Sequence, residues 1–124
     1  MHHTREIPRS GWADYLSLLS SLERDHWVRI ETDSEDTGEQ PLAQRLPLIE
    51  IALEEKGSDQ GAIEVMVGRP GDEITHRIFS PNHIYAEESD SGELECLDIE
   101  DADHVKTLIY FDEPRASEEL PSTT

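Results

Sequence analysis

The sequence predicts a mainly β domain of the α+β class. An N-terminal helix is expected to pack on a meandering antiparallel sheet of about six or seven strands that forms a small barrel. Three observations lead to this prediction. Apolar residues recur at helical spacing in residues 10–24, and from His26 onward they alternate with polar residues at a period of two. Turn residues then recur at short intervals, and no crossover helix fits between the strands, which argues against parallel pairing.

The first segment, residues 1–9, is expected to be an extended arm ended by Pro8. A helix should follow from Ser10 to Arg24, with Ser10 as its N-cap and Asp14 near the positive end of the helix dipole. One apolar stripe of this helix should cover the sheet, and it consists of Trp12, Tyr15, Leu16, Leu19 and Leu22.

The central segment contains three patterns typical of half-buried antiparallel strands. They are "HWVRIET", "LPLIEIALEEKG" and "AIEVMVG", in which apolar residues alternate with polar ones. An acidic stretch rich in turn residues, "TDSEDTGEQP", separates the first pattern from the second and is expected to be a loop.

Four predicted turns divide the rest of the chain into strands. Two turns place proline at their second position, Arg69–Asp72 and Ser80–His83. Two more are predicted from other residues, at Ser89–Gly92 and Glu100–Asp103. Residues 10–111 are therefore expected to form one domain. Residues 112–124 lack periodicity and aromatic side chains, which predicts a disordered acidic tail.

Charge is the strongest global signal in the chain. Ten basic and 29 acidic residues give a net charge of −19, and only two of the ten basic residues are lysines. Such a chain is repelled by nucleic acid backbones and by anionic membranes. Three interpretations stay open: adaptation of the protein surface to a salty cytoplasm, a surface that binds cations or a basic partner, and a mimic of nucleic acid.

Several other classes of protein are disfavoured. The single cysteine, Cys96, excludes an intramolecular disulfide framework, and it is interpreted as a small buried hydrophobic residue. No apolar run approaches the length of a membrane span, and the first residues do not resemble a secretory signal, so a cytoplasmic protein is expected. Motifs for nucleotide binding or for a serine nucleophile are absent, and no catalytic residue and no cofactor are assigned.

The stretch "RPGDEITHRIFSPNHIYAEE" carries the candidate site residues. The strand period places His76 with Ile74 and Ile78 on the apolar side, where a structural histidine with hydrogen-bond partners is the simpler interpretation. Asp72, His76 and His83 are the candidates for a metal or small-molecule site, because a tight turn could make the two histidines cross-strand neighbours. Their spacing matches no common zinc pattern.

Two weaker metal patterns occur elsewhere. The acidic stretch "DSEDTGEQPLAQ" resembles a calcium loop at its first positions, but Gln44 stands where a bidentate glutamate is required. The N-terminal Met1-His2-His3 could chelate Cu(II) or Ni(II), although an accident of sequence is the simpler explanation.

The motifs "TREIPRSGW", "LPL", "IEVMVG", "PGDEITHRI", "GELECLDIEDAD" and "TLIYF" occur in this order between Thr4 and Phe111. As a set they resemble a family of short acidic prokaryotic proteins known only as a domain of unknown function. The resemblance implies one small domain and transfers no activity to Asp72, Thr75 or His76.

The sequence therefore favours a non-catalytic accessory or protein-interaction module that acts through a sheet edge or an acidic surface, with salt adaptation of its surface. The first alternative is a small-molecule or metal site around Asp72, His76 and His83. The second alternative is a nucleic-acid mimic that occupies a basic partner. Neither nucleic acid nor a membrane is an expected partner.

Overall fold

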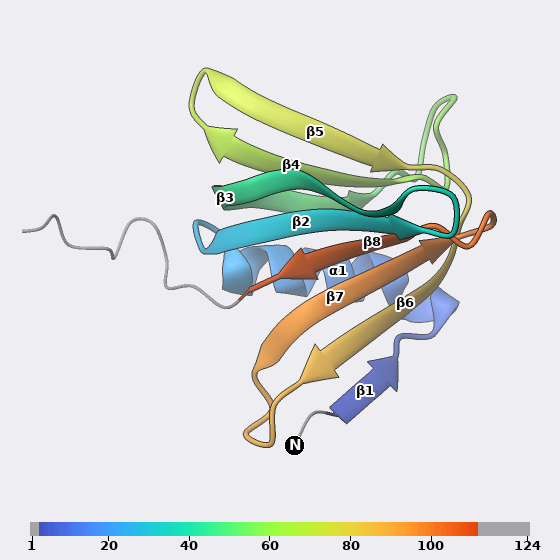
Figure 1. Cartoon of the computed structure of the whole chain (residues 1–124), viewed down its shortest axis with the longest axis horizontal. Helices are drawn as coiled ribbons and strands as arrows, with labels where there is room; N and C mark the ends of the chain where they lie inside the picture. Colours follow the sequence, from blue (N-terminus) through green and yellow to red (C-terminus); the bar gives the residue numbers. More distant parts are fainter. Residues whose placement is uncertain (1–2, 112–124) are drawn as a thin grey trace, which may run out of the picture.

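The computed structural model describes residues 3–111. One helix packs on an eight-stranded antiparallel sheet, which confirms the predicted mainly β class (Figure 1). No helix in the described residues is long and apolar enough to cross a membrane. In chain order the elements are β1 (His3–Glu6), η1 (Arg9–Gly11), α1 (Trp12–Glu23), β2 (Trp27–Ser34), β3 (Gly38–Leu53), β4 (Ile63–Arg69), β5 (Asp72–Ile78), β6 (Pro81–Glu88), β7 (Leu94–Asp101) and β8 (Lys106–Tyr110).

The strand order is β1-β6-β7-β8-β2-β3-β4-β5. Two meanders, β2 to β5 and β6 to β8, lie side by side because β8 pairs with β2. Within residues 3–111 no pairing joins β1 to β5, so the sheet is open and does not close into the expected barrel. Alternation of apolar residues indicates which face of each strand is buried, but it carries no information about whether the two edge strands meet.

Two segments expected outside the sheet belong to it. Residues 3–6 of the expected arm pair with β6 as strand β1, which brings the strand count to eight. The acidic stretch over residues 32–41 is mostly strand, and its turn is confined to residues 35–37 between the paired residues Ser34 and Gly38. The acidic residues there are solvated positions on a hairpin, because a two-stranded ladder satisfies the backbone and leaves the side chains exposed. The expected tail, residues 112–124, lies outside the described residues.

The connection from β5 to β6 is not the hairpin that the sequence suggested. Pro81 is the first residue of β6, where the missing N–H of proline is tolerated. Ser80 before it has a left-handed φ of 53°. β5 lies at one edge of the sheet and β6 lies beside β1 near the other, so the two strands are not neighbours.

The helix begins two residues later than expected. Arg9–Gly11 forms a short 3₁₀ turn, and Gly11 occupies the N-cap position of α1 with no side-chain hydrogen bond. Ser10 lies inside the 3₁₀ turn and is not the N-cap. Asp14 is in the first turn of α1, as expected for a carboxylate near the positive end of the helix dipole.

The buried face of α1 is formed by Trp12, Leu16 and Leu19. Trp12 is 2% exposed, and its indole N–H donates to the carbonyl of Ile7 over 2.9 Å. Ile7 in turn donates its backbone N–H to the Ile84 carbonyl on β6. These contacts tie the chain between β1 and α1 into the same core as the sheet.

The sheet is strongly curved. His76 on β5 lies on the core-facing side, opposite Val65, and its Nε2 is 3.4 Å from the hydroxyl of Thr107 on β8. Three strands separate β5 from β8 in the sheet order, so this contact requires the sheet to bend around its own core. The right-handed twist of neighbouring strands and the bulges in β3 allow such bending.

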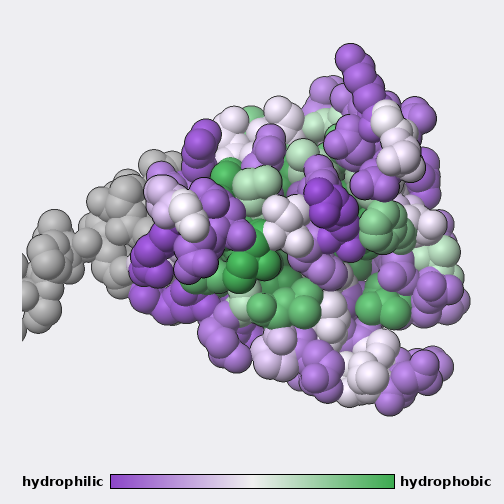
Figure 2. Space-filling view, turned by 90° about the horizontal axis from the view of Figure 1, so that it is seen from above, coloured by the Kyte–Doolittle hydropathy of each residue, from purple (hydrophilic) through white to green (hydrophobic). Residues whose placement is uncertain are grey.

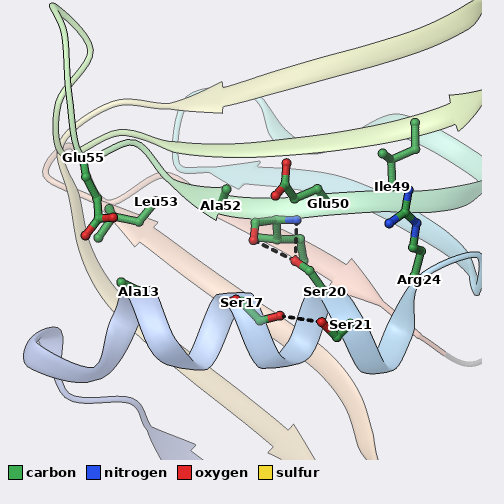
Figure 3. Close-up of a pocket in the computed structure, with 11 residues that line it drawn as sticks. Ala13, Ser17, Ser20, Ser21, Arg24, Ile49, Glu50, Ala52, Leu53 and Glu55 are labelled. Carbon is green, nitrogen blue, oxygen red and sulfur yellow. Dashed lines mark hydrogen bonds between the residues drawn. The ribbon is translucent and has the colours of Figure 1, made fainter.

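Strand β3 changes partners along its length. Its first part pairs with β2, and residues 48–53 pair with β4. Leu48 exchanges backbone hydrogen bonds with the α1–β2 turn. After Leu48, β2 no longer pairs with β3, and α1 lies along that unpaired side of β3. The Ser20 hydroxyl donates to the Ile51 carbonyl over 2.8 Å and accepts from the Ile51 N–H over 2.9 Å (Figure 3). The Ser20 hydroxyl thus satisfies the two backbone groups of Ile51 that a neighbouring strand would otherwise bond.

Replacing Ser20 with alanine is expected to lower the free energy of unfolding by about 1–3 kcal/mol, because two partly buried backbone groups of Ile51 lose their partner. Denaturant unfolding at fixed salt measures this cost. Ser21→Ala is the matched control, since the exposed Ser21 hydroxyl contacts only its own helix, and about 0.5 kcal/mol or less is expected. Equal costs for the two variants would contradict the role given to Ser20.

Candidate interaction groove

A cavity of about 840 Å³ lies between α1 and the ends of β1, β6, β7 and β8. We call it the α1 groove and define its apolar floor as Tyr15, Leu18, Leu19, Leu22, Leu94 and Phe111. Leu18 is 60% exposed and Leu22 is 57% exposed, whereas Leu19 is buried. The groove therefore exposes two large apolar side chains to solvent.

The helical period explains why these leucines are exposed. At about 100° per residue, Leu22 lies roughly 120° around the helix from the fully buried Leu16. Leu18 precedes Leu22 by four residues, so the two side chains form one ridge beside the buried face. The sequence predicted Leu22 in the buried stripe, and this prediction is wrong because Leu22 is exposed. The structure buries Trp12, Leu16 and Leu19, while Leu22 projects past the sheet.

Four carboxylates line the same groove, and two of them, Glu23 and Glu88, have side chains that are only 16% and 23% exposed. The acidic rim consists of Glu23, Glu88, Glu93 and Glu95, and Arg5 is the one arginine or lysine that lines the groove. Four carboxylates and one guanidinium give a net charge of −3 when His26 is neutral. The Arg5 Nη2 is 3.1 Å from the Glu88 Oε2, and this hydrogen bond raises the pKa of Arg5. Glu23 pairs with the His26 imidazole.

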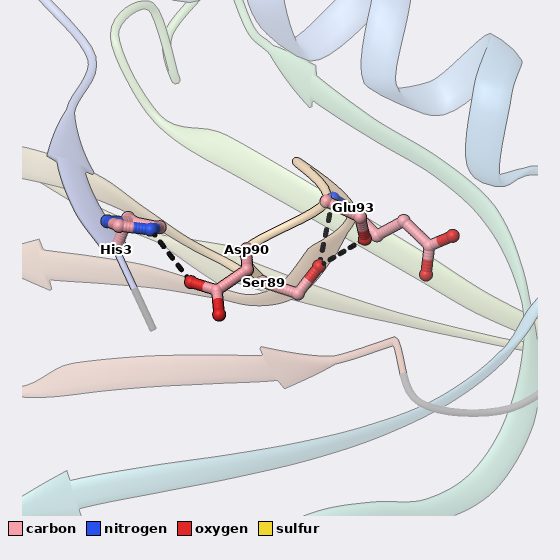
Figure 4. Close-up of polar contacts among 5 residues, drawn as sticks. His3, Ser89, Asp90 and Glu93 are labelled. Atoms are coloured by element: carbon pink, nitrogen blue, oxygen red, sulfur yellow. Dashed lines mark hydrogen bonds and ion pairs between the residues drawn. The ribbon is translucent and has the colours of Figure 1, made fainter. Parts of the chain in front are cut away.

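Hydrogen bonds in the turn between β6 and β7 position Glu93 at the groove. The Ser89 hydroxyl accepts from the Glu93 N–H over 3.2 Å, and the Asp90 carboxylate lies 3.0 Å from the His3 imidazole on β1 (Figure 4). These bonds hold the turn against the first strand. The Glu93 carboxylate extends away from them (Figure 4), and Glu93 lines the groove.

Tyr15 is the floor residue that lies next to Arg5. The Arg5 guanidinium is 5.8 Å from the centre of its ring, and the Tyr15 side chain packs against the core. Burial raises the pKa of the Tyr15 phenol, so this side chain stays neutral at physiological pH. The groove therefore combines apolar side chains with ionic groups, and the Tyr15 phenol adds no charge to it.

The structure does not bring Asp72, His76 and His83 together. Asp72 is exposed opposite Arg69 at the β4–β5 turn, and His76 faces the core, where desolvation lowers the pKa of its imidazole. The His83 Nδ1 is 2.8 Å from the Glu6 carboxylate, and its ring stacks on Tyr85. Among residues 3–111 no group of three or more histidine, cysteine or acidic side chains could hold a metal ion.

Cys96 and Asp98 lie two residues apart on strand β7, and the surroundings of each raise its pKa. Burial, followed by the nearby Glu87 and Asp98 carboxylates, raises the pKa of the Cys96 thiol to about 12, so the thiolate form is suppressed. Burial also raises the pKa of Asp98 to about 6, and one Asp98 oxygen has no hydrogen-bond partner among the described residues. Neither residue lines the α1 groove.

The exposed leucines were not identified from the sequence. The segment "YLSLLSSL" holds more apolar residues than one buried stripe needs, and Leu18 lies off the stripe. That surplus was the available signal for an apolar surface beyond the core.

Comparison with known protein families matches most of the chain to one family model. Residues 3–120 match the model of a family described as "Family of unknown function (DUF5335)". No curated protein and no solved structure matches the chain.

Proposed function

Because the chain belongs to the DUF5335 family, which has no known function, we propose a function from its own geometry: a non-catalytic protein-interaction module whose binding site is the α1 groove. The observation that carries the proposal is the solvent-exposed ridge of Leu18 and Leu22 beside the partly buried Tyr15 and Leu94. Large apolar side chains that gather at one surface, with a polar rim, are typical of protein-binding sites.

The shape of the groove supports a macromolecular partner over a small molecule. Small-molecule sites bury about 70–90% of their ligand in a concave pocket. Here two of the six floor residues are more than half exposed, so a small ligand would leave much of its own surface in water. A partner with its own apolar surface would instead cover the ridge, and burial of each leucine would stabilise the complex.

The sheet edge at β5 is a less favourable contact. Exposed Asp72, Glu73 and Arg77 lie on this edge strand, and charged side chains on an edge oppose the addition of another strand. Ile74 and Phe79 are also exposed in this region, at 49% and 57%. They provide apolar control positions away from the α1 groove.

Photo-crosslinking tests the proposed site. With benzoylphenylalanine in place of Leu18, we expect a discrete protein adduct in native lysate; with the same group in place of Ile74, we expect none. Because both positions are exposed, collision alone should label them equally. Adducts of equal yield from both positions, or none from position 18, would count against the groove as the binding site.

We also propose that the surface is adapted to high salt. The net charge of −19 and the scarcity of lysine support this, and so does the use of arginine. Five arginines stack on aromatic rings, among them Arg29 on Tyr110 at 4.0 Å and Arg45 on Trp27 at 4.2 Å. Guanidinium groups are weakly hydrated, so arginine can stack on these rings and shield them from water at high salt.

Figure 2 shows hydrophilic residues around the periphery of one face, with apolar residues near its middle.

The salt proposal predicts that the midpoint of thermal unfolding rises as KCl increases from low to multimolar concentration. Repulsion among the excess carboxylates opposes the compact state, and salt screens that repulsion. Circular dichroism melts across a KCl series measure the trend. A midpoint that stays flat or falls would show that screened self-repulsion does not govern stability.

A further inference from the structure

Resting on the proposed function of the α1 groove, we infer the chemistry of its partner: an amphipathic helix whose apolar stripe is flanked by lysine or arginine side chains. The groove constrains both the charge of the partner and its secondary structure.

The charge follows from the acidic rim. Glu23, Glu88, Glu93 and Glu95 line the groove together with Arg5, the one arginine or lysine in its lining. Arg5 pairs with Glu88 and His26 with Glu23, and the lining still holds more carboxylates than cations. An acidic partner would add like charges at short range, which costs several kcal/mol in protein interfaces. A helix with cations beside its apolar stripe would place them against the rim. Anionic membranes are disfavoured for the same reason.

The helical form follows from the backbone around the groove. Leu94 pairs with Glu88, the Ser89 N–H donates to the Glu93 carbonyl, and the Phe111 N–H donates to the Glu95 carbonyl. β7 has a strand on each side, so it offers no open edge to an extended peptide. The edge strand β1 is four residues long, and Arg5 is its one residue in the groove lining. An extended ligand gains its affinity from a backbone ladder, whereas a helix satisfies its own backbone and binds through side chains.

The ridge on α1 also matches a helical partner. Leu18 and Leu22 are one helical turn apart, and ridges of this spacing pack into the grooves between side chains of a second helix. Leu94 and Phe111 would flank the second helix from the sheet side. The partner is thereby expected to present leucine-sized side chains at positions i, i+3, i+4 and i+7.

Three synthetic helical peptides of about 18 residues, labelled for fluorescence anisotropy, test the inference with the full-length chain in molar KCl. The first combines a leucine stripe with lysines. The second has the same composition in a permuted order without a stripe, and the third keeps the stripe but replaces lysine with glutamate. We expect the first to bind at least about tenfold more tightly than either of the others.

Matched protein variants separate the apolar contact from simple charge attraction. Leu18→Asp/Leu22→Asp and Ile74→Asp/Phe79→Asp each add two negative charges at exposed apolar positions. Charge attraction alone would strengthen peptide binding to both variants. We expect the affinity for the leucine–lysine peptide to fall by about tenfold or more in the first variant and to stay unchanged in the second.

The other outcomes overturn defined parts of the account. Equal binding of the permuted peptide would reject the helix stripe, and equal binding of the glutamate peptide would reject the basic flank. Either result leaves the groove itself as a binding site if position 18 still crosslinks to a partner. Crosslinks from position 18 to residues 112–124 of the chain or to a second copy would reject the inferred partner. The absence of any crosslink would remove the proposed function as well.

Discussion

Replacing Trp12 with alanine is expected to lower the free energy of unfolding by about 3–5 kcal/mol, the range for truncating a large buried aromatic side chain. Trp12 is 2% exposed, donates to the Ile7 carbonyl and lies beneath the Arg9 guanidinium at 4.4 Å. Its loss would leave a cavity and an unpaired carbonyl between β1 and α1. Because small domains are stable by only about 5–15 kcal/mol, this variant should be close to unfolding at moderate temperature.

Denaturant unfolding at constant KCl measures this effect, and two variants serve as controls. Trp12→Phe keeps an aromatic ring but removes the indole N–H, so a smaller cost of about 1–2 kcal/mol is expected. Leu18→Ala on the exposed ridge should change stability by about 0.5 kcal/mol or less. A cost below about 1 kcal/mol for Trp12→Ala would show that the junction of arm and helix is not part of the cooperative core.

The double substitution Leu18→Asp/Leu22→Asp is expected to weaken binding of the natural partner by about a hundredfold or more. Full burial of a leucine side chain contributes about 1.5–3 kcal/mol, and each 1.4 kcal/mol corresponds to a factor of ten in affinity. Both side chains are more than half exposed in the free chain, so the substitution should leave the folded state intact. An unchanged unfolding midpoint at matched salt would confirm that the loss of binding is local.

The fold class could be predicted because it depends on local patterns. A change of apolar period from the helical value to two separates α1 from the strands, and Pro70-Gly71 mark the β4–β5 turn in which Gly71 has φ 83°. The order of the strands depends on pairing between distant segments. Nothing local in β8 or β2 indicates that they pair, and this pairing separates β5 from β6.

The same distinction applies to His76. Its place on the core-facing side, opposite the buried Val65, follows from the strand period, whereas Ile74 of the same predicted stripe is 49% exposed. Its neighbour Thr107, the one buried polar side chain among the described residues, is 31 positions away and meets it through curvature of the sheet. A period defines the face of a strand, whereas curvature arises from twist and bulges that are spread over several strands.

The α1 groove could not be predicted for a related reason. A stripe of Tyr15, Leu19 and Leu22 indicates an apolar helix face, but its buried width depends on how far the sheet extends beneath the helix. The sheet covers Leu19 and leaves Leu22 exposed. The acidic rim comes from α1, β6, the β6–β7 turn and β7, so only the assembled fold shows that these carboxylates line one groove.

Capture of the partner from native lysate at matched salt tests the central claim most directly. The bait proteins are the unmodified chain, Leu18→Asp/Leu22→Asp and Ile74→Asp/Phe79→Asp, immobilised in equal amounts after their folding has been verified. The account predicts a protein that the unmodified chain and the Ile74/Phe79 variant retain and that the Leu18/Leu22 variant loses. Retention of the same protein by the Leu18/Leu22 variant, or its loss from both variants, would contradict the assignment of the α1 groove as the binding site.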